Sequence, residues 1–450
     1  MANPPAAPAI DALAQFAATA SAADCMPHLA LHTADALVAL RAGAATAEGQ
    51  ALLRFVAGAD ASPLGRVAAN AAVMRLTEID DIHRASCVTV GALTVPVAVA
   101  FATDDTPPAH FFDALYVGHE LALRLALAAG GARLLTRGQW PSLIVAPFGA
   151  AATAGRLLGL SPARMRHALA LAVSSAPRQP GRFQGTRSGR WWLFGEAVRS
   201  GCMAALAAAD GIDGDPEMLS AEWLKSVGGE LAAPDQLTPT GLLTQGLSIK
   251  PHASAKQALA AIHGLRQLIA QHQLVPEQIE AIEVQVPPPY AAMLDRDPPR
   301  TNRLATLVNA PWQLALAALN PALLDDVARE VWPEDPSLPA LAARIRVVAD
   351  PSLDALYPAA FPACVIVRVG GTHHEILVTD SPGDPALAYD AAQLIDKAGR
   401  MLGSGAELDS VRSVLGLPGN GSAMPKLRAA FGYAAHEQDS QNGQGLSIHP

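Results

Sequence analysis

The sequence contains little charge, few aromatic residues and no long uninterrupted apolar segment. Of its 450 residues, 16% are charged and 5% are aromatic, whereas 50% are hydrophobic. The longest uncharged apolar stretch, from Pro141 to Gly155, falls short of the roughly 20 residues that a membrane-spanning helix needs. The composition therefore indicates a chain with a large buried core, ordered over most of its length, and it predicts no transmembrane segment.

Cysteine is scarce, and the four cysteines stand far apart with no CxxC pair. This spacing does not fit a zinc or iron–sulfur site and suits reduced thiols. No positively charged region precedes the first apolar residues, so we expect no secretory signal and a cytoplasmic protein. The net charge of −9 argues against nucleic acid or an anionic membrane as a partner.

The sequence also lacks GxGxxG, P-loop, GxSxG and HExxH motifs. Their absence removes the commonest signatures of nucleotide-binding proteins, serine hydrolases and metalloproteases. His373, His374 and Glu375 could in principle bind a metal ion. Adjacent residues on a strand point to opposite faces, so we predict no metal site there.

The first half of the chain, residues 6–246, follows a helical pattern rich in Ala and Leu. Thr106-Pro107 and Gly130-Gly131 mark the two ends of one helix, and Ser161-Pro162 opens another. The small residues from Gly195 to Ala209 allow helices to approach closely. These features predict a large all-helical core.

Near residue 280 the hydrophobic period changes from 3.6 to 2, which is typical of strands. Residues 279–286 and 343–348 alternate in this way, and residues 364–369 and 374–378 flank Gly370-Gly371 as a hairpin. Helices are predicted over residues 254–271, 312–319, 391–402 and 406–415.

The simplest architecture is mostly α, with an inserted domain. Residues 1–246 and 388–432 would form a large all-helical domain from both chain ends, and residues 247–387 a smaller α+β domain. Residues 433–450 are rich in Gln, Ser, Gly and Asn and are expected to be a disordered tail.

The first candidate for chemistry is an acidic run in an apolar stretch, which contains Glu78, Asp80, Asp81 and His83. Carboxylates among apolar neighbours are candidates for raised pKa values and for acid–base work. The alternative is that these side chains cap a helix or pair with arginines. The pattern alone leaves both interpretations open.

Two cationic segments are candidates for binding an anion. Arginines gather in an otherwise glycine-containing stretch, and the planar guanidinium suits bidentate binding of carboxylates. A solvated loop or a subunit contact is the alternative. Lys250-Pro251-His252 precedes a predicted helix, whose N-terminus favours anions. The arginines are Arg178, Arg182, Arg187, Arg190 and Arg199.

Several segments, in the right order over about residues 6–430, together resemble the MmgE/PrpD family, which includes 2-methylcitrate dehydratase, cis-aconitate decarboxylase and iminodisuccinate epimerase. The acidic run resembles the aspartate-rich signature of that family. The other matching segments are Gly118-His119-Glu120 with Arg124, Phe148 to Ala152 with Leu157 to Leu160, Gly195 with Ala197 and Gly201, and Lys250-Pro251.

This resemblance implies a helical domain with an inserted α+β lid, a homodimer, and an active site between the two domains. It also implies small di- and tricarboxylate substrates and chemistry without a metal or organic cofactor. Dehydration, decarboxylation and epimerisation are the reaction types of the family.

The positions that resemble the active site of the family are partly replaced. Glu78 stands for an aspartate, Ile82 for a threonine, and Val88 or Thr89 for a histidine. Arg190 replaces a lysine, whereas Lys250 matches one. In the same comparison Trp140 and Trp312 replace a histidine and a tyrosine, and Ser142 takes the place of a threonine.

The leading hypothesis is a cofactor-independent lyase or isomerase of a small carboxylate. Glu78, Asp80, Asp81 and His83 would carry proton transfer. An epimerase or racemase of the same substrate class and a non-catalytic carboxylate-binding homologue are the alternatives. The substrate contacts would be Arg187, Arg190, Lys250, His252, Trp140, Ser142 and Trp312.

Overall fold

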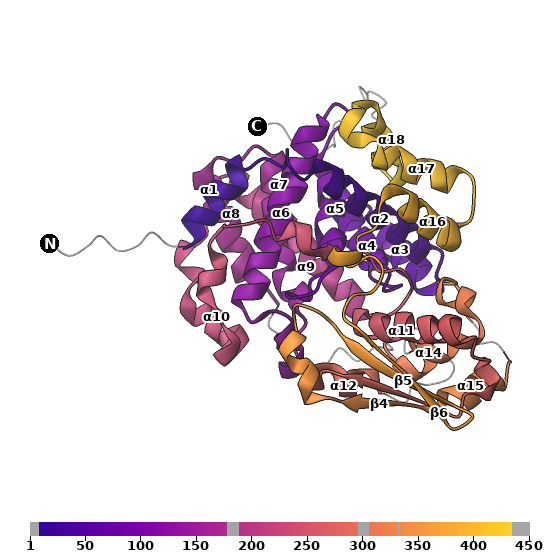
Figure 1. Cartoon of the computed structure of the whole chain (residues 1–450). Helices are drawn as coiled ribbons and strands as arrows, with labels where there is room; N and C mark the ends of the chain where they lie inside the picture. The colour runs from indigo at the N-terminus through magenta and orange to yellow at the C-terminus, as the bar shows by residue number, and fades with distance from the viewer. Residues whose placement is uncertain (1–8, 178–188, 296–305, 331–333, 434–450) are drawn as a thin grey trace.

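The computed structural model describes residues 9–177, 189–295, 306–330 and 334–433. A larger helical unit lies beside a smaller unit that holds a mixed sheet (Figure 1). The predicted mostly α fold, with an inserted α+β part, is confirmed. None of the described helices has the length and apolar character needed to cross a membrane.

The helical unit is built from the two ends of the chain, which lie against each other (Figure 1). α7 packs against both α6 and α9 in its centre, and the C-terminal α16 and α17 pack on α2. The helices from the first part are α1 (Ala9–Thr19), α2 (Met26–Ala44), α3 (Ala47–Ala59), α4 (Pro63–Met74), α5 (Val90–Phe101), α6 (Pro108–Ala128), α7 (Pro141–Leu157), α8 (Pro162–Ser174), α9 (Gly189–Ala209) and α10 (Ala221–Gly228). Those from the C-terminal part are α16 (Ala391–Leu402), α17 (Ala406–Leu415) and α18 (Met424–Ala430).

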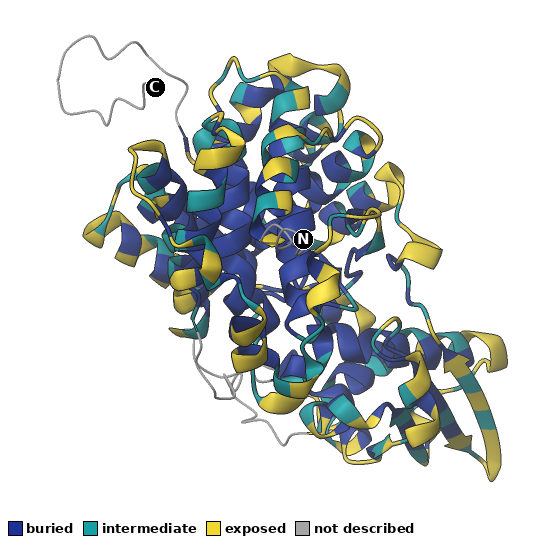
Figure 2. Ribbon diagram, turned by 90° about the vertical axis from the view of Figure 1, so that its left-hand side faces the viewer, coloured by how far each residue is buried: buried dark blue, intermediate teal, exposed yellow. Residues whose placement is uncertain are grey.

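Close helix packing in this unit depends on small residues, and its central helices are almost entirely buried (Figure 2). Gly195 of α9 is an example, because a Cβ atom there would lie 2.2 Å from the carbonyl oxygen of Ala68 in α4. The two helices could not keep this distance with any larger residue. Since α9 carries Arg190 and α4 ends just before Arg75, the contact fixes two cations of the site described below.

We expect Gly195→Ala to lower the free energy of unfolding by about 1–3 kcal/mol, because backbone must move to admit the methyl group. Urea denaturation measures this change. Gly58→Ala in α3 is the matched control, since a Cβ atom there meets nothing within 4 Å. The control should be neutral or stabilising by up to about 1 kcal/mol through its helix propensity. Equal effects of the two substitutions would contradict the packing argument.

The smaller unit contains a four-stranded sheet in the order β4-β3-β5-β6, covered by α11 and α14. β3 pairs in parallel with β4 and antiparallel with β5, and Gly370-Gly371 joins β5 to β6 in left-handed backbone conformations. The elements are α11 (Lys256–His272), β3 (Ala281–Val286), α12 (Pro288–Leu294), α14 (Ala310–Leu319), α15 (Ser337–Ala342), β4 (Ile345–Ala349), β5 (Ala363–Val369) and β6 (Thr372–Val378).

Most predicted elements are found with small shifts of their ends. α16 and α17 have the predicted bounds, and Ser161 caps α8. Thr106, however, is not the cap of α6, which begins at Pro108 after Pro107. The Thr106 side chain accepts a hydrogen bond from the backbone of Thr103 instead.

Two hydrophobic cores match the two units. One core combines mainly residues 10–253 with residues 394–433, together with Leu307 and Val327, and a second contains mainly residues 258–378. The exact limits at 246/247 and 387/388 stay predictions, and the predicted tail lies outside the described residues except for Tyr433. A short ladder joins the units, because β1 (Ile82–His83) pairs antiparallel with β2 (Leu247–Ser248).

Candidate active site

The acidic run lies in a buried loop between α4 and β1, and the β1–β2 ladder brings Lys250 to it. Ile82 pairs with Ser248, two residues before Lys250. Glu78 has a positive φ of 56°, a left-handed conformation that costs a non-glycine residue about 1–3 kcal/mol. Such strain persists only where the surrounding contacts hold it, and here ion pairs do so.

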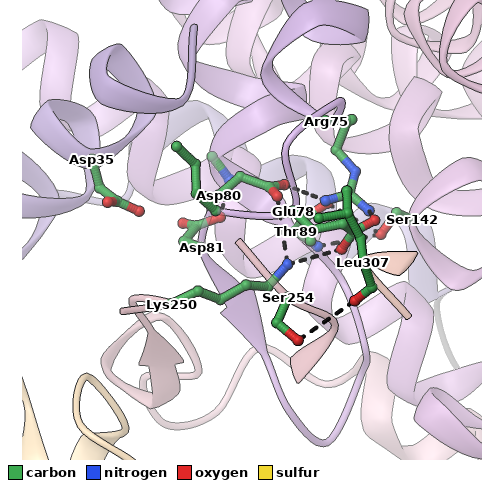
Figure 3. Close-up of polar contacts among 12 residues, drawn as sticks. Asp35, Arg75, Glu78, Asp80, Asp81, Thr89, Ser142, Lys250, Ser254 and Leu307 are labelled. Carbon is green, nitrogen blue, oxygen red and sulfur yellow. Dashed lines mark hydrogen bonds and ion pairs between the residues drawn. The ribbon is translucent and has the colours of Figure 1, made fainter. Parts of the chain in front are cut away.

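Three cations surround the Glu78 carboxylate, and two of them, Arg75 and Lys250, are labelled in Figure 3. Lys250 Nζ lies 3.1 Å from Oε2, and Arg190 Nη2 and Arg75 Nη2 lie 3.2 and 3.6 Å from Oε1. Burial alone would raise the pKa of Glu78. The attraction of Lys250, Arg75 and Arg190 outweighs that effect and lowers its pKa to about 2. Glu78 is therefore a carboxylate at any physiological pH.

Asp80 of the same loop is the second carboxylate of this cluster. It pairs with Arg75 Nη1, and its Oδ1 lies 3.5 Å from Lys250 Nζ. Lys250 itself is only 1% exposed, so its ammonium group is directed by these two carboxylates rather than by water. The cluster of Arg75, Glu78, Asp80, Arg190 and Lys250 thus forms one buried charge network, here called the ionic cluster.

A cavity of about 220 Å³ opens beside the ionic cluster, with walls from both units. Trp140 forms an aromatic wall, stacked on Phe194 with ring centroids 5.5 Å apart. The guanidinium groups of Arg75 and Arg190 lie over the Trp140 ring at 5.7 and 5.8 Å from its centroid. The cavity therefore offers cations next to an aromatic side chain, which suits a small organic anion.

Asp81 lies next to Asp80 but is directed elsewhere. Its Oδ1 accepts a hydrogen bond of 2.9 Å from the Gly91 backbone at the start of α5, and its Oδ2 lies 3.2 Å from His32 Nδ1. Burial raises the pKa of Asp81 to about 7, with the Gly91 hydrogen bond opposing this rise. Its side chain is not among the cavity walls. Asp81 therefore holds the loop against α2 and α5 rather than facing the cavity.

His83 is likewise directed away from the cavity. Its Nδ1 lies 2.9 Å from Ser86 Oγ, and Gly246 approaches its Nε2 side. Burial, followed by the charge of Arg84, lowers the pKa of His83 to about 4. The imidazole is neutral near pH 7 and lies outside the cavity walls.

The predicted substrate contacts divide into two groups. Trp140, Arg190 and Lys250 line the cavity, and their contact with a substrate stays a prediction. Ser142 is fully buried behind the wall, where its Oγ accepts a hydrogen bond of 3.2 Å from the Thr89 backbone. Trp312 packs against the core of the smaller unit and does not line the cavity.

Two further predicted contacts are absent from this cavity for different reasons. His252 lines a separate cavity, because the chain bends from Pro251 onward and turns its side chain away from that of Lys250. Arg187 lies outside the described residues. The structure therefore brings together Glu78, Asp80 and Lys250 with Arg190, and separates them from His252.

Sequence reasoning missed several side chains of the cavity. Arg75 follows α4 as its C-cap residue, a common place for a cation, so nothing in the sequence marked it. Lys256 donates hydrogen bonds of 2.7 Å to both Ser381 and Asp384, and burial lowers its pKa to about 8 against the attraction of Asp384. The Tyr290 hydroxyl donates to the Pro362 carbonyl at 3.0 Å, so it is held in the wall.

No group of three or more His, Cys, Asp or Glu side chains within the described ranges is arranged to hold a metal ion. His373 and His374 are adjacent on β6, where successive side chains alternate between faces. The ring of His374 lies 4.1 Å from that of His272 in α11, whereas His373 is exposed on the other face.

The buried neutral state of His83 predicts a pH dependence of stability. Its folded pKa, about 4, lies below the ordinary value of 6.5, so the unfolded chain binds the extra proton first. The stabilisation is complete above about pH 6.5 and is lost as the pH falls towards 4, on the order of 3 kcal/mol.

We expect the melting temperature to fall steeply between pH 6.5 and 4, and less steeply in His83→Gln. Calorimetry over this range measures both slopes. The variant His110→Gln, at a half-exposed position, should follow the wild-type slope. Parallel curves for His83→Gln and the wild type would contradict the assignment.

The chain belongs to the MmgE/PrpD family. Residues 11–227 match the MmgE/PrpD N-terminal domain, and residues 252–413 match the MmgE/PrpD C-terminal domain. A cis-aconitate decarboxylase-like protein from Aspergillus oryzae, oryM, is 28% identical over 203 residues. That match covers 43% of this chain and 39% of the relative, so the chain aligns with well under half of that protein. The resemblance stated from the sequence is confirmed at the level of the family.

Proposed function

We propose that this protein is a lyase that decarboxylates a small di- or tricarboxylate in the cavity beside the ionic cluster. The observation that carries the proposal is a cavity lined by the three cations of the ionic cluster, in which the facing carboxylate, Glu78, has a pKa of about 2. The proposal is narrower than family membership, which supports only a dehydratase or decarboxylase acting on carboxylates.

The charge of the ionic cluster favours an anionic substrate. Three cations (Arg75, Arg190 and Lys250) face two carboxylates (Glu78 and Asp80), which leaves one net positive charge in a buried site. Lys256 and Asp384 form a separate pair that adds no net charge. Because charges interact strongly away from water, one carboxylate of the substrate would be held here.

The low pKa of Glu78 supports decarboxylation over the other reactions of the family. Dehydration and epimerisation need a base that removes a proton from carbon, and a carboxylate with a pKa of about 2 is a poor base at pH 7. Decarboxylation needs no such base. The bond between the carboxylate and its carbon breaks, carbon dioxide leaves, and the electron pair remains on the carbon until a proton arrives.

Lys250 is placed to deliver that proton. Its ammonium group lines the cavity and is held by Glu78 and Asp80 at 3.1 and 3.5 Å. Transfer of one proton from Nζ to the carbon completes the product, and solvent returns a proton to the lysine. Arg190 would hold a remaining carboxylate, and Trp140 would cover the apolar part of the substrate.

The similarity to a cis-aconitate decarboxylase-like protein agrees with this reaction. The proposal retains the cofactor-independent chemistry predicted from the family resemblance. A homodimer and a cytoplasmic location also stay predictions.

Two observations favour a second candidate, a carboxylate-binding protein without catalysis. Ile82 lines the cavity where the family resemblance implies a threonine, and it can neither donate nor accept a proton. Asp81 and His83, two of the predicted acid–base groups, also face away from the cavity. Such a protein would keep Arg190 and Lys250 for binding alone.

A panel of di- and tricarboxylates, followed by NMR and by carbon dioxide release, tests the two candidates. When the reaction is run in deuterium oxide, decarboxylation predicts equal amounts of carbon dioxide and product, and one deuterium from the solvent in each product molecule. An alkene formed without carbon dioxide would indicate dehydration, and deuterium in recovered substrate would indicate epimerisation. Binding in a thermal-shift assay without turnover of any compound would overturn the proposal in favour of a binding protein.

For the substrate so found, we expect Arg190→Gln to raise KM by roughly 10- to 100-fold with a smaller change in kcat, because a charged hydrogen bond to the bound anion is lost. Steady-state kinetics separate the two constants. Arg54→Gln, at an exposed arginine of α3, is the control and should leave KM unchanged. An unchanged KM in Arg190→Gln would remove Arg190 from the substrate site.

A further inference from the structure

A second cavity lies on the other side of the segment that carries Lys250. Its volume is about 370 Å³, and it lies between α11, α16 and the short 3-10 helix that begins at Pro321. Leu259, Ile262 and Pro321 form an apolar floor. The polar wall is formed by His252, His263, Arg266, Asp325, Tyr389 and Arg400. This cavity contains the histidine that the sequence analysis assigned to the substrate.

Hydrogen bonds in the polar wall converge on Asp325 from two sides. Arg266 Nη1 lies 3.3 Å from His252 Nε2, His252 Nδ1 lies 2.8 Å from Asp325 Oδ1, and Arg400 Nε lies 2.9 Å from Asp325 Oδ2. Because a guanidinium can only donate, His252 accepts at Nε2 and donates its Nδ1 hydrogen to Asp325. Asp325 is thus satisfied on both oxygens.

The charges of this wall leave one cation without a counterion. Arg400 pairs with exposed Asp396 and with buried Asp325, whose pKa is lowered because His252 and Arg400 outweigh the effect of burial. Burial, together with Arg266 and His252, lowers the pKa of His263, so that imidazole is neutral near pH 7. Among the described residues, no carboxylate lies within ion-pair distance of Arg266. The cavity therefore combines an apolar floor with the guanidinium of Arg266, which is exposed to solvent at its edge.

The wall of this cavity also holds the segment around Lys250 in place. Arg400 Nη2 donates a hydrogen bond of 3.2 Å to the Pro251 carbonyl, next to Lys250. The backbone N–H groups of Ile249 and Ala253 donate to Gly383 and Leu324 at 2.9 and 3.2 Å. Any ligand that draws Arg400 towards itself therefore acts on the backbone that positions the Lys250 ammonium against Glu78.

We propose that this cavity is a second binding site for a small organic anion, with Arg266 and Arg400 as its cations, and that its occupancy changes the position of Lys250. The anion is a carboxylate with a short apolar part, which matches the floor and the guanidinium groups. The site stands apart from the ionic cluster, so its existence does not rest on the proposed decarboxylation.

Equilibrium dialysis with radiolabelled malonate tests the site, with Lys250→Met used to weaken binding in the cavity of the ionic cluster. We expect Lys250→Met to retain binding, and Arg266→Gln/Lys250→Met to lose about tenfold or more in affinity, since a hydrogen bond to a charged group is removed. Arg54→Gln/Lys250→Met is the matched control and should bind as Lys250→Met does. Malonate binding that is the same with and without Arg266, or none in Lys250→Met, would overturn the proposal.

Hydrogen exchange tests the coupling in the same proteins. Malonate is expected to change the exchange of a peptide covering residues 249–253 in Lys250→Met, and to leave it unchanged in Arg266→Gln/Lys250→Met. Unchanged exchange in both proteins, despite binding, would overturn the link to Lys250. Neither experiment measures turnover, so a failure here is distinguishable from a failure of the proposed decarboxylation.

Discussion

Lys250→Met is expected to lower kcat by roughly 10²- to 10⁴-fold for the substrate of the proposed reaction, the usual effect of removing a proton donor. Methionine has a similar length and keeps the apolar contacts of the lysine stem, so the change removes mainly the ammonium group. Loss of that charge also leaves Glu78 and Asp80 with fewer counterions, which should raise the pKa of Glu78 above its present value of about 2.

Single-turnover kinetics at saturating substrate measure the effect on the chemical step. The control is Lys225→Met, at an exposed lysine of α10, which should be indistinguishable from the wild type. If Lys250 only held the substrate, KM would rise while kcat stayed near the wild-type value. A kcat within threefold of the wild type would therefore remove Lys250 as the proton donor.

Lys397→Met is expected to lower the free energy of unfolding by about 3–5 kcal/mol, because it breaks a buried ion pair on one side. Lys397 of α16 and Asp35 of α2 are both 0% exposed. The ammonium group also donates a hydrogen bond of 2.8 Å to the carbonyl of Ile79, between Glu78 and Asp80. The variant thus leaves a buried carboxylate without its counterion and a buried carbonyl without its donor.

Urea denaturation measures the change. The control is Lys426→Met, at an exposed lysine of α18, which should change the free energy of unfolding by less than about 0.5 kcal/mol. The double variant Asp35→Ala/Lys397→Met should recover part of the loss, since no buried charge then remains unpaired. A loss below about 1 kcal/mol in Lys397→Met would show that the Asp35 carboxylate does not depend on this lysine.

Helices and strands were predicted well where short-range patterns, such as hydrophobic periodicity and turn residues, determine them. The change of period near residue 280 and the Gly370-Gly371 turn identified β3, β5 and β6. The order β4-β3-β5-β6, with its parallel β3–β4 pair, depends on long-range packing and left no trace in the periodicity. The prediction that Thr106 caps α6 was wrong, because the Thr106 hydroxyl accepts a hydrogen bond from the backbone N–H of Thr103 instead.

The candidate site was less predictable, because its contacts join distant parts of the chain. Glu78 and Lys250 are 172 residues apart, and only the family resemblance placed them together. Asp81 and His83 have the same chemistry as Glu78 and Asp80, yet the turn of the loop directs them to Gly91 and Ser86. The order of residue types in the sequence does not indicate how the loop turns, so it does not predict which of these side chains face the cavity.

The Lys397–Asp35 contact has a consequence for synthesis on the ribosome. Asp35 and Ile79 are made early, whereas their common partner follows Asp35 by 362 residues. At roughly 5–20 residues per second, the nascent chain waits about 20 to 70 s for that lysine. We expect the loop with the acidic run to take its final form only after α16 has left the exit tunnel. A chain that stops before α16 would then have its early helices but an unformed acidic loop.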